Sequence, residues 1–212
     1  MKYKKIRGKA RRLRAIEEWS SNNLIFDKET LLENKRLYVK FRVDPWSRLS
    51  LGNSMYPEPD NEYREKFIEG LVNIYDLWKS NLDKLNIDYY LKIWIVFPNF
   101  RESQVVCAIG DKIEFYKNNF FEENKLDFPS KKFSKNSNSL LSHFKWEHYS
   151  HEELIDDDYV GDVNDYVDKQ SYIKTKEWFD KFMNSQHRIV KNELSGKDLH
   201  FFKTNDIWLG SK

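Results

Sequence analysis

A long stripe of large apolar side chains is the feature that most constrains how this sequence can fold. Between residues 63 and 85 such side chains recur every three or four positions, which is the spacing of one face of an α-helix. The stripe consists of Tyr63, Phe67, Leu71, Ile74, Trp78, Leu82 and Leu85. We expect a helix of roughly six turns, capped at its start by Asp60 and able to approach a sheet closely at Gly70.

Three strand-like runs surround this helix. Residues 37–43 alternate between apolar and polar, which is typical of a strand with one buried face. Residues 89–97 are apolar on both faces except for Lys92, and residues 104–109 form another apolar run. The turn-like residues between the last two runs predict a β-hairpin.

The order of these elements predicts an α+β fold. We expect an antiparallel sheet with the long amphipathic helix on one face, arranged as the split β-α-β core of a ferredoxin-like fold with a C-terminal helical elaboration. In that topology the strand at 89–97 lies at a sheet edge, although it is apolar on both faces. We therefore expect the helix around Trp178 to cover its second face. Weaker patterns predict helices at 113–121 and 175–186 and strands at 141–149 and 206–209.

Length and composition favour one domain. The chain has 212 residues, of which 16% are aromatic, and these large rings can build a substantial core. We expect a single α+β domain over residues 1–212. It would comprise a basic N-terminal helix or arm at 1–20, a core at 36–149, and an acidic segment with a C-terminal helix and strand at 150–212.

The sequence also predicts a soluble cytoplasmic protein. Cys107 is the only cysteine, which excludes an internal disulfide, and its apolar surroundings indicate a buried, unreactive thiol. No run approaches the ~20 apolar residues that span a bilayer. The basic N-terminus is not followed by the apolar region of a secretory signal.

Charge is concentrated in two segments of opposite sign. The chain has 36 basic and 34 acidic residues, yet eight basic and no acidic residues fall in the first fourteen positions. Residues 147–168 contain nine acids and no lysine or arginine. The basic segment has the spacing of a short amphipathic helix whose outer face includes Arg11 and Arg12. The two segments can pair with each other or bind a partner, and both alternatives stay open.

A basic and aromatic sheet face is one candidate site. Rings and cations alternate along it, namely Tyr38, Lys40 and Arg42 on one predicted strand and Tyr90, Lys92 and Trp94 on another. If these strands are neighbours, the rings can stack on bases and the cations can neutralise phosphates of single-stranded RNA. In the alternative, a helix covers the face and the basic side chains extend past it to solvent.

The irregular segment 44–60 is a second candidate, because long loops inside a domain are often functional. Its polar and aromatic residues, together with one from the preceding strand, would form a pocket for an anion or a peptide. These are Arg42, Trp46, Arg48, Asn53 and Tyr56. The alternative is that the apolar residues of the loop only anchor it to the core.

Two histidines at the start of the acidic segment are candidate metal ligands. His148 and His151 are three residues apart, so they would share a face of a helix but point to opposite faces of a strand. The aromatic residues around them favour a strand. We expect no metal site here.

The acidic residues that follow resemble a twelve-residue calcium-binding loop that starts at Asp156, but Val160 and Val167 occupy positions that need oxygen ligands. We therefore interpret Asp156, Asp157 and Asp158 as a patch that docks on a partner. Glycine-rich phosphate loops and nucleophile motifs are missing from the sequence, so we expect no catalytic residue and no cofactor.

Three runs resemble a family of bacterial domains whose function is not known. They are Tyr38-Val-Lys-Phe-Arg-Val-Asp-Pro-Trp-Ser-Arg-Leu, Tyr90-Leu-Lys-Ile-Trp-Ile-Val-Phe-Pro and Gln104-Val-Val-Cys-Ala-Ile-Gly. The resemblance covers roughly residues 1–130. It implies a small soluble bacterial protein and carries over no site residue.

These observations together predict a non-catalytic binding protein that acts through protein–protein contact. One form would be an immunity or antitoxin-like protein whose acidic patch covers the cationic site of a nuclease toxin. The first alternative is a single-stranded RNA binder that uses the basic N-terminal helix and the basic and aromatic face. The second is a metal-dependent enzyme at the histidines and acids.

Overall fold

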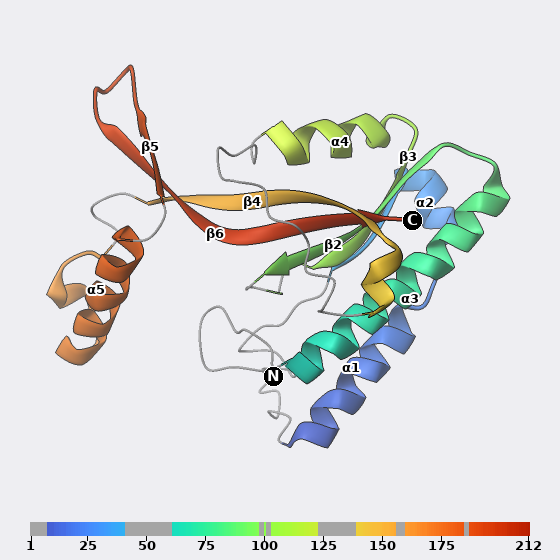
Figure 1. Ribbon diagram of the computed structural model, residues 1–212, viewed down its shortest axis with the longest axis horizontal. Coiled ribbons are helices and arrows are strands. Elements are labelled where there is room, and N and C mark those ends of the chain that lie inside the picture. Colours follow the sequence, from blue (N-terminus) through green and yellow to red (C-terminus); the bar gives the residue numbers. More distant parts are fainter. Residues whose placement is uncertain are drawn as a thin grey trace. The chain divides into compact units, whose positions relative to one another are not determined.

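The computed structural model describes residues 8–40, 61–97, 100, 103–122, 139–155, 160–184 and 187–212 (Figure 1). Its contacts divide the chain into two compact units. Unit 1 consists of Met1–Tyr149 and Asp206–Lys212, and unit 2 consists of Ser150–Asn205. The boundary falls within two long strands, β4 (Lys145–Ile155) and β6 (Asp198–Ser211), which begin in one unit and end in the other.

Three helices build one layer of unit 1, namely α1 (Lys9–Asn23), α2 (Lys28–Asn34) and α3 (Asn61–Leu85). The apolar stripe does form a long helix, because its period keeps Phe67, Leu71 and Ile74 fully buried on one side. Asp60, its expected N-cap, lies outside the described residues. The N-cap of α2 is Asp27, whose carboxylate accepts a hydrogen bond from the Thr30 amide at 2.9 Å.

The predicted α+β class and the split β-α-β unit are confirmed. β1 (Arg36–Lys40) and β2 (Tyr89–Phe97) both pair antiparallel with β3 (Gln104–Ile109), so they run parallel to each other with β3 between them. Helix α3 connects β1 to β2 and packs on the sheet. The order continues as β1-β3-β2-β6-β4, so strands are added beyond β2, whereas a ferredoxin-like sheet adds its fourth strand beside β1.

This order explains why β2 is apolar on both faces. The strand is internal, because β6 pairs antiparallel with its other edge from Asp206 to Gly210. Its second face lies under α4 (Lys112–Glu122), where Ile113 and Tyr116 pack against Tyr90. The sequence predicts that the helix around Trp178 covers this face, and this prediction is wrong. That helix is α5 (Lys169–Met183), which belongs to unit 2 and in which Trp178 is 44% exposed.

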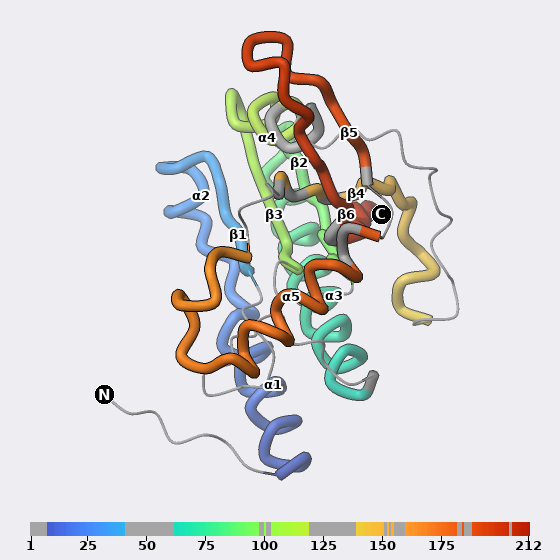
Figure 2. The backbone as a smooth tube through the Cα atoms, turned by 90° about the vertical axis from the view of Figure 1, so that its left-hand side faces the viewer, coloured from blue at the N-terminus to red at the C-terminus, as the bar shows by residue number. Residues whose placement is uncertain are grey.

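The basic N-terminal segment is a docked helix over its described length. α1 lies beside α3 in both views (Figure 1, Figure 2), with Ile16 fully buried and Leu13 and Trp19 packed on the core. Gly70 permits this contact, since an added Cβ would meet the Ser20 Oγ at 2.9 Å. The close approach predicted at Gly70 is therefore made to α1, and not to the sheet.

Unit 2 contains the end of β4, a 3-10 helix at Val163–Asp165, α5, β5 (His187–Lys191) and the start of β6. β5 and β6 form a hairpin closed by the Asn192 amide, which donates to the Lys197 carbonyl at 2.9 Å. Gly196 has a φ of 68° in its turn, a conformation that glycine adopts without strain. No described helix in either unit is long and apolar enough to cross a membrane.

A further 3-10 helix at Ser139–His143 precedes β4. The strand predicted at 141–149 therefore begins four residues late, at Lys145, and runs on to Ile155. The short strand predicted at 206–209 is the end of the much longer β6. β5 and α2 were not predicted.

Candidate functional site

A cluster of polar side chains crosses the sheet of unit 1 on the face that α4 covers. Lys92 of β2 lies at its centre, with its side chain 16% exposed. The ammonium group donates to the Glu147 carboxylate at 2.6 Å and to the Ser211 hydroxyl at 3.2 Å. These partners come from β4 and β6, so the one lysine joins three neighbouring strands. A buried charge requires such partners, because its desolvation is costly.

Two tyrosines extend the cluster, and their surroundings disfavour the charged form of each. The Tyr149 hydroxyl donates to Glu147 at 3.0 Å. Burial, and then the negative charge of Glu147, raise the pKa of Tyr149 to about 12. The same two causes, in the same order, raise the pKa of Tyr90 well above its ordinary value. Both phenols therefore stay neutral at physiological pH.

The polar contacts of this cluster link neighbouring strands and do not activate a catalytic group. Lys92 and Ser211 resemble the pair that some hydrolases use, but such a lysine must accept the serine proton. Here the lysine ammonium already donates to the Glu147 carboxylate. The arrangement therefore stabilises the strand order and sets up no nucleophile.

The basic and aromatic residues of the sequence prediction do share this face. Tyr38 and Lys92 are both opposite Val106 of β3, and Lys40 and Trp94 are both opposite Gln104. The two strands are not neighbours, however, because β3 runs between them. The rings of Tyr90 and Trp94 are only 6% and 5% exposed, and Tyr38 is 56% exposed. One ring of the three is thus accessible for stacking on a base.

His148, a candidate metal ligand from the sequence, pairs with an acidic side chain. The His148 Nε2 lies 2.8 Å from the Asp206 Oδ1, and its ring packs against Trp208 with ring centres 4.3 Å apart. β4 is extended through residue 151, and the side chain of His151 lies outside the described part of the chain. Among the described residues no group of three histidine, cysteine or acidic side chains is placed to hold a metal ion.

Much of the acidic segment is bound within the chain. Five of its nine acids have partners: Glu147 binds Lys92, Glu152 binds Arg188, Asp162 and Asp165 form a capping box, and Asp168 accepts from Ser171. The side chain of Glu153 and residues 156–158 are outside the described part of the chain, so the fate of Asp156, Asp157 and Asp158 stays a prediction.

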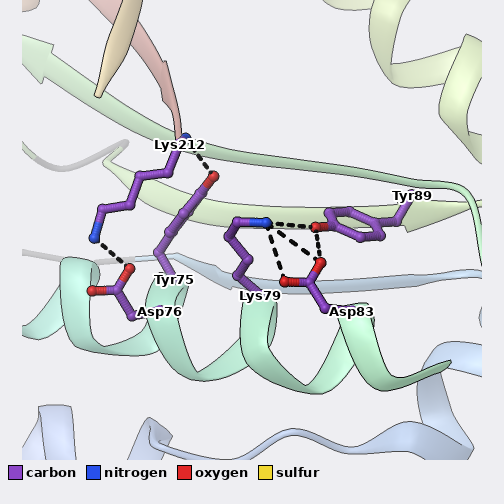
Figure 3. A network of polar contacts seen from close by, with 6 residues as sticks. All are labelled: Tyr75, Asp76, Lys79, Asp83, Tyr89 and Lys212. Carbon is purple, nitrogen blue, oxygen red and sulfur yellow. Dashed lines mark hydrogen bonds and ion pairs between the residues drawn. The ribbon is translucent and has the colours of Figure 1, made fainter. Parts of the chain in front are cut away.

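A second polar network fastens the last residue to α3 (Figure 3). The Lys212 amide donates to the Tyr75 hydroxyl at 2.9 Å, and its ammonium group donates to Asp76 at 2.5 Å. Two turns further along α3, Asp83 accepts a hydrogen bond from the Tyr89 hydroxyl at 2.6 Å, and this hydrogen bond is the main cause that lowers the pKa of Asp83. These contacts hold the helix against β2 and the end of β6.

The remaining predicted site residues divide into two groups. Arg11 is exposed and Arg12 is half-buried on α1, on a helix that the core anchors. The proposed pocket lies outside the described residues, and with it Arg42, Trp46, Arg48, Asn53 and Tyr56.

Exposed apolar side chains in unit 2 are the feature that the sequence did not reveal. Ile189 is 52% exposed, Val190 36% and Leu154 54%. Trp178, Val163, Val167 and Leu194 are exposed as well. Among the described residues of this unit only Phe202 and Ser150 are buried. A sequence signal for the hairpin did exist, in Asn192 and Gly196 between two short runs of strand formers.

Comparison of the chain with protein-family models, with curated proteins and with solved structures gives no match.

Proposed function

We propose that this protein acts in the cytoplasm by binding another protein, without catalysing a reaction, and that residues 150–205 carry the contact surface. The observation that carries this proposal is the exposure of large apolar side chains in unit 2. Seven of its large apolar side chains are exposed, whereas most of those of α3 and β2 in unit 1 are buried. Exposed apolar surface of this kind is typical of sites that a partner covers.

The size of unit 2 supports the same proposal. A segment this short buries little of its surface by itself and gains correspondingly little stability from it. Unit 2 is stabilised locally by the hairpin, by the Asp168 cap of α5 and by the ion pair between Arg188 and Glu152 at 2.7 Å. A partner that covers the face of the hairpin bearing Ile189 would supply apolar burial that these polar contacts do not.

The antitoxin-like form of this function is the more specific alternative. It needs a free acidic patch that covers a cationic site on a toxin. Because five of the nine acids have partners within the chain, this form depends on Asp156, Asp157 and Asp158. Replacing all three with asparagine tests it separately, since the apolar surface is left intact.

Site-specific photo-crosslinking in cells tests the general proposal. A photo-reactive residue in place of Ile189 reports on the proposed surface, and one in place of Leu32 is the matched control, since the two side chains are 52% and 49% exposed. We expect a discrete crosslinked protein at position 189 that is absent at position 32. The same products at both positions, or none at 189, would contradict the proposal.

A further inference from the structure

The turn that closes the β5–β6 hairpin presents a large apolar side chain at its tip. Residues 192–197 join the two strands, and the structure describes all of them. Leu194 lies within this turn, and its side chain is fully exposed. Such positions usually carry glycine or short polar residues, which suit a turn. The leucine therefore contributes nothing that the turn itself requires.

Hydrogen bonds from Asn192 order the backbone around Leu194. The Asn192 Oδ1 accepts from the Leu194 amide at 3.0 Å and from the Ser195 amide at 3.2 Å. Its backbone carbonyl accepts from the Gly196 amide at 2.8 Å. The Lys197 amide donates to the Ser195 hydroxyl at 3.3 Å. Four consecutive amides are thus bonded within the turn, which orders the backbone that carries the leucine.

This order distinguishes Leu194 from an ordinary exposed leucine. Single apolar side chains are common on protein surfaces. On a flexible loop, however, such a side chain loses conformational freedom when it binds, and this cost lowers the affinity. The turn at 192–197 is already ordered, so more of the apolar burial of Leu194 is converted into affinity. Burial of one leucine corresponds to a gain in affinity of about tenfold to a hundredfold.

The charges beside Leu194 favour a protein pocket over a membrane or a nucleic acid. Residues 191–198 contain two lysines and two acids, so they carry no net charge. Phosphates and anionic lipid surfaces attract an excess of lysine and arginine, and one leucine buries little apolar surface in a membrane. A protein can present both signs of charge, with a basic side chain beside Glu193 and an acidic one beside Lys197.

We propose that Leu194 is an anchor that enters an apolar pocket of the partner protein, and that Asn192 positions it. The pocket has a polar rim with a basic group for Glu193 and an acidic group for Lys197. This inference rests on the proposed function, because it names the part of residues 150–205 that enters the partner. It goes further, since a contact elsewhere in these residues would leave the hairpin tip in solvent.

Photo-crosslinking in cells tests the anchor. A diazirine-bearing amino acid replaces Leu194 in one protein and Val167 in the matched control, since both side chains are fully exposed. We expect one discrete protein product from position 194, about tenfold or more above the amount of the same product from position 167. A diazirine reacts with whatever lies beside it. Mass spectrometry should therefore locate the captured residues of the partner among apolar side chains.

The positioning role of Asn192 is tested in the same assay. Asn192→Ala removes the acceptor of the Leu194 and Ser195 amides and should reduce the product from position 194 by about threefold to tenfold. Asn192→Asp keeps an acceptor there and should restore it. Hydrogen exchange in the protein alone gives a second readout. The amides of Leu194 and Ser195 should exchange faster in Asn192→Ala, and at the wild-type rate in Asn192→Asp.

The outcomes separate this inference from the proposed function. A product at position 189 with none at 194, or equal amounts at 194 and 167, overturns the anchor and leaves the wider contact surface standing. A product at 194 with none at 189 supports the anchor and counts against the wider surface. No product at either position overturns both.

The nature of the product and its dependence on Asn192 decide the rest. A product at position 194 that is a lipid, or that nuclease removes, assigns the tip to a membrane or a nucleic acid and overturns the proposal. Unchanged capture and unchanged hydrogen exchange in Asn192→Ala contradict the positioning role.

Discussion

The ammonium group of Lys92 on β2 lies 2.6 Å from the carboxylate of Glu147 on β4, although β6 runs between the two strands. Residue 92 is the only charge in an otherwise apolar strand, and Ser211 of β6 accepts its second hydrogen bond at 3.2 Å. The contacts of Lys92 therefore tie β6 and β4 to β2 and stabilise the order of these three strands.

Glu147→Gln should lower the pKa of Tyr149 from about 12 toward its ordinary value of 10.0, because the charge of Glu147 is one of the causes that raise it. Burial, which is the larger cause, remains, so the change is partial. The difference between ultraviolet titrations with and without Tyr149→Phe isolates this one phenol. Glu65→Gln, on the exposed side of α3, is the control. An unchanged titration would mean that the carboxylate is not beside the ring.

Acid should destabilise α5 through its N-cap. The hydrogen bonds from Ser171 lower the pKa of Asp168 below its ordinary value of 3.8. The charged carboxylate is favoured in the folded state, so its contribution is present above pH 3.8 and is lost as the pH falls through the lower, folded value. Thermal unfolding of Asp168→Asn should depend less on pH in this range than that of the wild type. Asp180→Asn serves as the control, and a slope equal to that of the wild type would refute the cap.

Gly210→Ala should destabilise unit 1 by roughly 1–3 kcal/mol, the usual cost of overpacking. An added Cβ would lie 2.7 Å from the Trp146 ring and 2.9 Å from the Ile93 side chain, and neither can move without disturbing the core. Urea unfolding gives the change in free energy. In the background of Trp146→Leu, which removes the ring, the same substitution should cost less. Additive effects would contradict this close approach.

Ile16→Ala should lower the free energy of unfolding by about 2–4 kcal/mol, because a fully buried side chain is removed from the contact between α1 and α3. Arg11→Ala, at an exposed position on the same helix, should change it by less than about 0.5 kcal/mol. If both substitutions are neutral, the basic segment is a loosely attached arm, and not part of the core.

Local patterns predicted the elements whose partners are close in the sequence. The stripe from Tyr63 to Leu85 has one period and one buried face, so the helix and its orientation follow directly. The apolar faces of β2 correctly indicated a strand covered on both sides. Its second face is covered by α4, whereas its second edge pairs with β6, which comes from more than 100 residues away. The polar residues Lys203, Asn205 and Asp206 interrupt the strand pattern of β6 in the sequence.

The candidate sites show the same limit. The sequence predicted that Tyr38 and Lys92 lie on the same face of the sheet. It did not predict that β3 runs between their strands. Lys92 did carry a usable signal, since a lone charge in a buried strand requires a partner. The identity of that partner, Glu147, could not be predicted, because it lies 55 residues away in the sequence.

Affinity purification with paired variants tests the proposed binding surface most directly. Ile189→Thr removes apolar surface from unit 2, and Leu32→Thr removes a similarly exposed side chain from α2, with exposures of 52% and 49%. Both variants are used after their unfolding midpoints match that of the wild type. We predict that a partner recovered with the wild type and with Leu32→Thr is depleted about tenfold or more with Ile189→Thr. Equal recovery with all three proteins would contradict a function based on the apolar surface of residues 150–205.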